Sequence, residues 1–294
     1  MRDRRQVVKL VKLQSRAILC PGCRRLINRD EPTCPHCGLK RPGSWWNRVS
    51  QGGVNDAERM TRAILYANIG MYVISLLLNP LSVGFSPDPF RFLSPSRGSL
   101  FFLGATGSIP VEQAGRWWTL ISASYLHGSV LHLVFNLLAF TQLAPFTLQE
   151  YGVYRMFSIY TLGGVMGFLI STLAGVPFTI GASAAVCSLI GAAIYYSKHR
   201  GGAYGQALYR QLGGWALGIF IFGLIVPGIN NWAHGGGFLA GLGAAHWLGY
   251  NERRKESLSH RWLGTACMAS TGLVLLWAVL SSFLALFLWS HPNG

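Results

Sequence analysis

The chain has 294 residues, of which 51% are hydrophobic and only 12% are charged, and its formal net charge is +15. Soluble globular proteins carry about 25% charged residues, so this composition argues against a soluble enzyme and predicts a membrane protein. The positive charge is concentrated in residues 1–62, which hold 14 Lys or Arg and 5 Asp or Glu. This polar, basic beginning predicts no cleavable signal peptide.

Residues 1–17 form a basic tail, and residues 18–42 contain four cysteines in the spacing C-x2-C-x10-C-x2-C. The four are Cys20, Cys23, Cys34 and Cys37. Two such pairs form two knuckles whose thiolates can close a tetrahedral zinc site. A segment this short cannot build a sufficient core, so bound metal would supply its folding energy. Disulfide bonds are the alternative, but a cytoplasmic location would keep the thiols reduced. The sequence therefore predicts a structural zinc ribbon, followed by a linker over residues 43–62.

Seven apolar runs have the length that spans a bilayer, which is roughly 17 to 25 residues. They are residues 63–79, 127–147, 155–174, 182–197, 211–228, 232–249 and 263–289. Lys and Arg gather in the loops after the second, fourth and sixth runs, among them Arg155, Lys198 and Arg253. The loops 175–181 and 229–231 carry no charge. Because positive loops stay on the cytoplasmic side, we expect a cytoplasmic N-terminus and an extracytoplasmic C-terminus in a multi-pass protein of the cell membrane.

Polar residues mark three of these runs. His132 and Asn136 are four residues apart in the second run and therefore share one face of a helix. Ser183 begins the fourth run, and His234 begins the sixth. Because alternate runs cross the membrane in the same direction, we expect all four residues at similar depth on the extracytoplasmic side.

Small residues offer the fourth and sixth runs a way to approach each other. Gly237 and Gly241 follow His234 by three and seven residues, and residues 181–185 read GASAA. Surfaces of this kind let two membrane helices pack closely. Such packing would bring Ser183 within hydrogen-bond reach of His234.

These residue types suit acyl transfer. A serine hydroxyl becomes a nucleophile when a base removes its proton, and His234 is the candidate base for Ser183. The unpaired N–H groups at a helix start, the Asn136 amide and His132 are candidates for stabilising an oxyanion. The acidic residues after position 62 fall in loops or at the ends of runs, so a Ser–His dyad fits better than a triad. Their absence from the runs also disfavours a proton-driven transporter. Each residue alone could instead serve helix packing; their shared depth favours a site.

The same residues resemble the rhomboid family of intramembrane serine proteases. The matching pieces occur in family order: HGSVLHLVFN for H-x-x-x-N, GASA for G-x-S-x, and AHGGGFLAG for A-H-x-x-G-x-x-x-G. The resemblance covers about residues 63–250 and implies six helices around a water-filled cavity that opens outward. It further implies Ser183 as the nucleophile, His234 as the general base, and His132 with Asn136 as oxyanion-stabilising residues.

Three features depart from the family pattern. Ala184 replaces the glycine that often follows the serine. Cys187 occupies the position, one turn beyond the serine, where many members place an aromatic residue that stacks on the catalytic histidine. The WR pair of the family's long first loop is matched only by Arg116-Trp117-Trp118.

The sequence thus predicts an all-α membrane protein with a rhomboid-like six-helix bundle over residues 63–250 and a small N-terminal zinc ribbon. A basic cytoplasmic loop, residues 251–262, leads to a seventh, C-terminal transmembrane helix over residues 263–289. We expect a serine endopeptidase that needs no cofactor at its active site. The expected partners are transmembrane protein substrates, membrane lipid and a protein partner of the ribbon; nucleic-acid binding by the ribbon's arginines is not favoured. The alternative function is a non-catalytic rhomboid-like protein that binds membrane clients.

Overall fold

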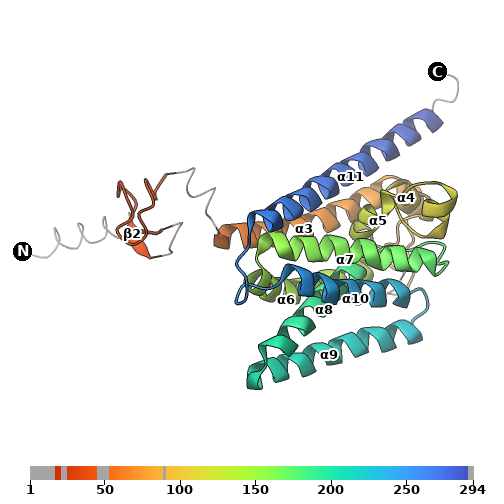
Figure 1. Ribbon diagram of the computed structural model, residues 1–294. Coiled ribbons are helices and arrows are strands. Elements are labelled where there is room, and N and C mark those ends of the chain that lie inside the picture. Colours follow the sequence, from red (N-terminus) through yellow and green to blue (C-terminus); the bar gives the residue numbers. More distant parts are fainter. Residues whose placement is uncertain (1–16, 21–24, 45–52, 89–90, 291–294) are drawn as a thin grey trace, which may run out of the picture. The chain divides into compact units, whose positions relative to one another are not determined.

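The computed structural model describes residues 17–20, 25–44, 53–88 and 91–290 of the chain. The chain divides into two compact units, Met1–Arg59 and Met60–Gly294. Figure 1 labels the strands and helices within them. Cys23, one of the four predicted zinc ligands, lies outside the described residues.

The N-terminal unit is built on a small antiparallel sheet, in which β1 (Ala17–Leu19) pairs with β2 (Leu26–Asn28). Cys20 directly follows β1. Its backbone N–H donates a hydrogen bond to the carbonyl oxygen of Arg25 at 2.9 Å, just beyond the paired strands. Cys20, Ile27 and Cys34 are buried together in a small core. In the part of this unit that the structure describes, so small an apolar core cannot stabilise a fold alone, which agrees with the expectation that the unit needs a metal.

The second unit consists of helices, and seven of the described helices are long, of which the first, α3, begins seven residues before this unit. They are α3 (Gly53–Leu77), α6 (Val130–Tyr151), α7 (Val153–Leu173), α8 (Ser183–Arg200), α9 (Gly202–Ile225), α10 (Asn231–Leu248) and α11 (Leu258–Ser290). Each of the seven predicted apolar runs overlaps one of them. Among the described residues, five helices are long and apolar enough to cross a membrane: α3, α6, α7, α9 and α11. The predicted all-α membrane fold is confirmed.

The helices α8 and α10 are not among these five, although the sequence analysis predicted a span for each. Both are short, and α8 ends in Lys198, His199 and Arg200, while α10 is rich in glycine. The basic residues lower the mean hydropathy of α8. Yet α8, α10 and α7 pack on one another more extensively than any other helices do, and they form the centre of the bundle in Figure 1. Helix α9 lies at one edge, against α8 and α10, and α11 lies at the other, against α7.

The long segment between α3 and α6 contains several short helical turns. They are η1 (Pro80–Ser82), α4 (Arg97–Phe102), η2 (Ile109–Gln113), α5 (Thr119–Ser122) and η3 (Ala123–Tyr125). Arg116 holds part of this segment together, because its guanidinium donates hydrogen bonds to the carbonyl oxygens of Phe101 at 2.7 Å and Phe102 at 3.0 Å. The same guanidinium lies over the Phe101 ring. Arg116, the first residue of the Arg-Trp-Trp sequence, therefore stabilises the conformation of the loop.

Arg155 departs from the expectation drawn from the charge pattern, which counted it among the loop cations. It is fully buried near the start of α7. Its guanidinium donates hydrogen bonds to the carbonyl oxygens of Gly249 at 3.0 Å and Arg254 at 2.9 Å, and to the side chain of Asn251. The Glu256 carboxylate accepts the backbone N–H of Arg155 at 3.1 Å. Arg155 thus connects α7 by hydrogen bonds to the segment before α11. The distribution of charged residues along the sequence does not indicate this role.

Candidate active site

Ser183 and His234, 51 residues apart in the sequence, meet at the N-terminal ends of α8 and α10. The Nε2 atom of His234 is 2.8 Å from the Oγ atom of Ser183, a hydrogen-bonding distance. Ser183 is the first residue of α8, and His234 lies in the first turn of α10. Both residues are partly exposed.

Glycines of α10 set how closely this helix approaches α8. A Cβ atom on Gly237 would lie 2.2 Å from the carbonyl oxygen of Ala184, and one on Gly241 would lie 1.9 Å from the carbonyl oxygen of Ser188. No side chain fits at such distances. The close backbone packing expected from the small residues is therefore present, and it holds the serine and the histidine at the same level of the bundle.

His132 lies at the start of α6, where one hydrogen bond engages its backbone and another its ring. The hydroxyl of Ser129 caps the helix by accepting the backbone N–H of His132 at 3.2 Å. The backbone N–H of Gly128 points to the Nδ1 atom of His132 at 3.4 Å. A neutral imidazole that accepts at Nδ1 carries its proton on Nε2. The local backbone thus favours the tautomer of His132 that presents an N–H donor at Nε2.

Gly181 brings His132 close to Ser183. A Cβ atom on Gly181 would be 2.7 Å from the Nε2 atom of His132 and 3.7 Å from the Oγ atom of Ser183. The φ angle of Gly181 is +125°, a conformation that other L-residues rarely adopt. Only glycine combines this φ angle with the lack of a side chain that the contact with His132 requires. Both constraints explain why the GASA sequence begins with glycine.

Asn136 lies one turn beyond His132 on α6 and is buried. Its amide nitrogen donates a hydrogen bond to the carbonyl oxygen of His132 at 2.8 Å. An asparagine amide carries two N–H groups, so this bond leaves the second one for another acceptor. The structure therefore places Asn136 on the same face of α6 as His132, with part of its donor capacity engaged by the helix itself.

No carboxylate contacts His234 in the part of the chain that the structure describes. The Nδ1 atom of His234 is buried and has no hydrogen-bond partner there. Cys187 is buried within α8, and among the described aromatic contacts none involves the ring of His234. This arrangement fits the expected pair of serine and histidine, without a third residue that orients the imidazole.

Asn230, which the sequence analysis did not single out, precedes α10 and connects three segments around the pair. Its side-chain oxygen accepts the backbone N–H of Ala233 at 3.1 Å, which caps α10. Its amide nitrogen donates to the hydroxyls of Ser171 at 2.5 Å and Thr179 at 3.0 Å. An asparagine directly before an apolar helical run is a capping signal, and that signal could have identified it.

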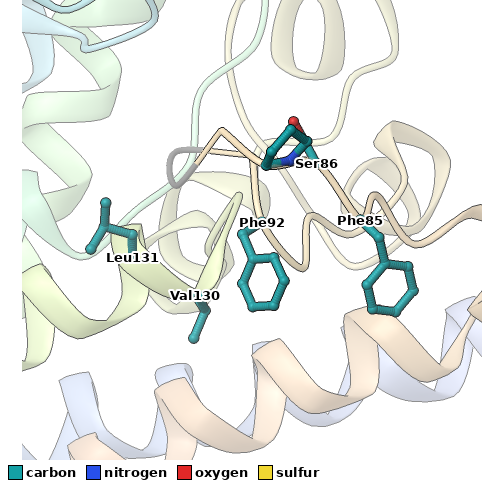
Figure 2. Close-up of a pocket in the computed structure, with 6 residues that line it drawn as sticks. Phe85, Ser86, Phe92, Val130 and Leu131 are labelled. Carbon is teal, nitrogen blue, oxygen red and sulfur yellow. The ribbon is translucent and has the colours of Figure 1, made fainter.

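An apolar recess of about 470 Å³ lies between the first turn of α6 and the segment that follows α3. It is lined by Phe85, Ser86, Pro87, Phe92, Val130 and Leu131. In Figure 2 the rings of Phe85 and Phe92 point to the same side as Val130. The backbone N–H of Val130 donates to the carbonyl oxygen of Phe92 at 3.3 Å, so the loop is attached to the helix start. None of the lining residues is titratable, and the recess adds no acid–base group to the site.

Cys20, Cys34 and Cys37 form a separate cluster that could hold a metal ion. Their Sγ atoms all lie within 4.8 Å of one another, and those of Cys20 and Cys37 are 3.7 Å apart. A disulfide bond measures about 2.05 Å, whereas two sulfurs at about 2.3 Å from one tetrahedral zinc ion would be about 3.8 Å apart. Burial acts to raise the pKa of the Cys34 thiol, but hydrogen bonds from the backbone of His36 and Cys37 lower it to about 7. The cluster therefore fits a thiolate-bound metal.

The central part of the chain is similar to known proteins. Residues 114–251 match the family model of the Rhomboid domain. RHOMBOID-like protein 6, mitochondrial, of Arabidopsis thaliana is 29% identical over 66% of this chain and 70% of its own length. RHOMBOID-like protein 5 of the same plant is 34% identical over 51% of this chain and 50% of its own length. Rhomboid protease GluP of Bacillus subtilis (strain 168) is 31% identical over 53% of this chain and 31% of its own length. The chain thus matches half or less of the last two relatives.

Proposed function

We propose, from the premise that this chain carries a rhomboid domain at residues 114–251, that it is an intramembrane serine endopeptidase. Its substrates are transmembrane or juxtamembrane segments of other membrane proteins. The observation that carries the proposal is the 2.8 Å distance between the Ser183 Oγ and His234 Nε2 atoms. A hydroxyl at that distance from an imidazole nitrogen can lose its proton as it attacks a carbonyl.

In the acylation step, His234 Nε2 accepts the proton of the Ser183 hydroxyl while Oγ bonds to the carbonyl carbon of the scissile peptide. The electron pair of the carbonyl π bond moves onto its oxygen and gives a tetrahedral oxyanion. When this intermediate collapses, the C–N bond breaks and His234 gives its proton to the leaving amine. A water molecule then loses a proton to His234, attacks the ester carbon and releases a carboxylic acid, and His234 returns the proton to Ser183.

The oxyanion would be stabilised by donors from two helix starts. The backbone N–H of Ser183 lies at the first position of α8, where helical N–H groups have no partner within the helix. The positive end of the helix dipole is at the same place. The Nε2–H of His132 and the second amide N–H of Asn136 are the side-chain donors that support this role.

The ends of the helices support a common depth for these groups. Helices α6, α8 and α10 begin at residues 130, 183 and 231, close to His132, Ser183 and His234. We place these three helix starts toward the extracytoplasmic face of the cell membrane, with the N-terminus of the chain in the cytoplasm. Substrate segments that unwind easily, because they contain helix-breaking residues, would reach Ser183 most readily.

The N-terminal unit is proposed to be a structural zinc ribbon. Cys20, Cys34 and Cys37 supply three thiolates, and Cys23, outside the described residues, is the fourth proposed ligand. Four thiolates close the coordination shell of zinc, so the ion would stabilise the fold and take no part in peptide hydrolysis. A protein partner is the proposed ligand of this ribbon.

A fluorophosphonate probe tests the proposal, because it reacts covalently with activated serines. We expect labelling of the wild-type protein in liposomes and its loss in both Ser183→Ala and His234→Ala. The second candidate function, a non-catalytic protein that binds membrane clients, gains support because no hydrogen bond holds the Nδ1 atom of His234 among the described residues. Absence of labelling in folded wild-type protein would reject the protease and favour this second function.

A further inference from the structure

Asn230 is bonded to each of the segments that carry or support the proposed catalytic pair. Through its side-chain oxygen it caps α10 at Ala233, and its own carbonyl oxygen accepts the backbone N–H of His234 at 3.1 Å. Through its amide nitrogen it reaches Ser171, near the end of α7, and Thr179. One short side chain therefore makes three hydrogen bonds in three directions.

Thr179 belongs to the short segment that directly precedes Ser183 in the chain. It lies four residues before Ser183, and both of its backbone groups are paired with Thr106, with N···O distances of 2.7 and 3.0 Å. Ser171 and Thr179 are buried, so their hydroxyls are not exchanged for water at little cost. The segment that precedes Ser183 is thus fixed on one side by Thr106 and on the other by Asn230.

We propose that Asn230 is the positioning residue that sets His234 relative to Ser183. This inference rests on the proposed protease function of the pair. In the described part of the chain, the Nδ1 atom of His234 has no hydrogen-bond partner. The place of the imidazole therefore depends on where α10 begins. Asn230 holds that start against the segment that precedes Ser183. One amide group therefore sets the positions of both reacting side chains.

A simple helix cap would explain only one of the three hydrogen bonds. A serine at position 230 could still cap α10 through its hydroxyl, but it is too short to keep the bonds to Ser171 and Thr179. An aspartate has the length of asparagine and caps equally well. The two partner hydroxyls can rotate and donate to its carboxylate, and the positive end of the α10 dipole stabilises that charge. The two substitutions therefore separate capping from positioning.

The test measures fluorophosphonate labelling of the full chain in liposomes, with the maximal rate of inactivation and the probe affinity determined separately. We expect Asn230→Ser to lower the maximal rate at least about tenfold, because small misplacements of reacting groups are costly. The probe affinity should stay close to that of the wild type, whereas loss of the bonds to the buried Ser171 and Thr179 hydroxyls should lower the thermal unfolding midpoint by a few degrees. Asn230→Asp should recover most of the rate. Asn231→Ser is the matched control, because Asn231 donates to the carbonyl oxygen of Phe220 in α9 instead.

Thr179→Val adds a double-mutant test. If Asn230 acts through Thr179, the double variant should be no slower than the slower single variant. A wild-type rate in Asn230→Ser, or equal losses in the serine and aspartate variants, would overturn the inference while leaving the protease proposal intact. Failure of the wild-type protein to react at all would reject the proposed function itself.

Discussion

The backbone of Gly241 in α10 lies directly against the carbonyl oxygen of Ser188 in α8. A Cβ atom at Gly241 would come within 1.9 Å of that oxygen. The contact therefore requires a hydrogen atom in place of a side chain, and it fixes the separation of the two helices that carry the proposed nucleophile and base.

Replacing Gly241 should separate α8 from α10. We expect Gly241→Ala to destabilise the protein by about 1–3 kcal/mol or more, as overpacking does in other cores, and to abolish fluorophosphonate labelling. Thermal unfolding in detergent checks the first effect, and the probe checks the second. Gly243→Ala is the control, because a Cβ atom at Gly243 meets nothing within 4 Å. Unchanged stability in Gly241→Ala would contradict the packing described here.

Gly181 should be irreplaceable for the chemistry. An alanine there would adopt an unfavourable φ angle and place a methyl group 2.7 Å from the Nε2 atom of His132. We expect Gly181→Ala to lower the labelling rate by about a hundredfold, because it displaces a reacting group. Gly235→Ala in α10, where a Cβ atom has open space, should label at the wild-type rate. Comparable rates in the two variants would argue against the site.

The two proposed oxyanion donors should differ in importance. Loss of one such donor typically lowers the rate by about 10²–10³-fold. We expect a loss of this order for His132→Ala and a smaller one for Asn136→Ala, because the Asn136 amide already donates to the carbonyl oxygen of His132. Inactivation rates of the two variants at saturating probe give the comparison. A larger loss in Asn136→Ala would reverse the assigned roles.

The cysteine cluster should bind zinc in the full chain. We expect one zinc ion per chain by elemental analysis of the purified protein, and its loss in Cys34→Ser. Cys267→Ser should retain the metal, because Cys267 is buried within α11 and belongs to the second unit. Metal content that is equally low in wild type and both variants would reject the zinc ribbon and revive the disulfide alternative.

Arg155 should be essential for stability, although it lies far along the chain from the segment that it contacts. Arg155→Met removes the donors for the carbonyl oxygens of Gly249 and Arg254. Hydrogen bonds to a charged group are worth about 1.5–3 kcal/mol each, so we expect a loss of roughly 3 kcal/mol or more in unfolding free energy. Arg210→Met makes the same charge change at an exposed position of α9 and should have little effect. Equal unfolding midpoints would show that the buried guanidinium is dispensable.

Much of this protein could be predicted from local sequence. The seven apolar runs predicted the seven long helices, because hydrophobic length is a property of consecutive residues. The prediction was least accurate for the membrane character of α8 and α10, which are the two shortest of the seven long helices and of which α8 ends in charged residues. The positions of Ser183 and His234 at helix starts likewise followed from where each apolar run began.

Tertiary structure decided the rest. The 2.8 Å approach of His234 to Ser183 and the three bonds of Asn230 join segments that are distant along the chain. Arg155 looked like a loop charge, because its sequence neighbourhood gives no sign of the carbonyl groups that surround it. Periodicity and spacing record what each helix can bury, whereas the distance between two helices depends on backbone contacts such as that of Gly241 with Ser188. Those contacts form only when the whole bundle is assembled.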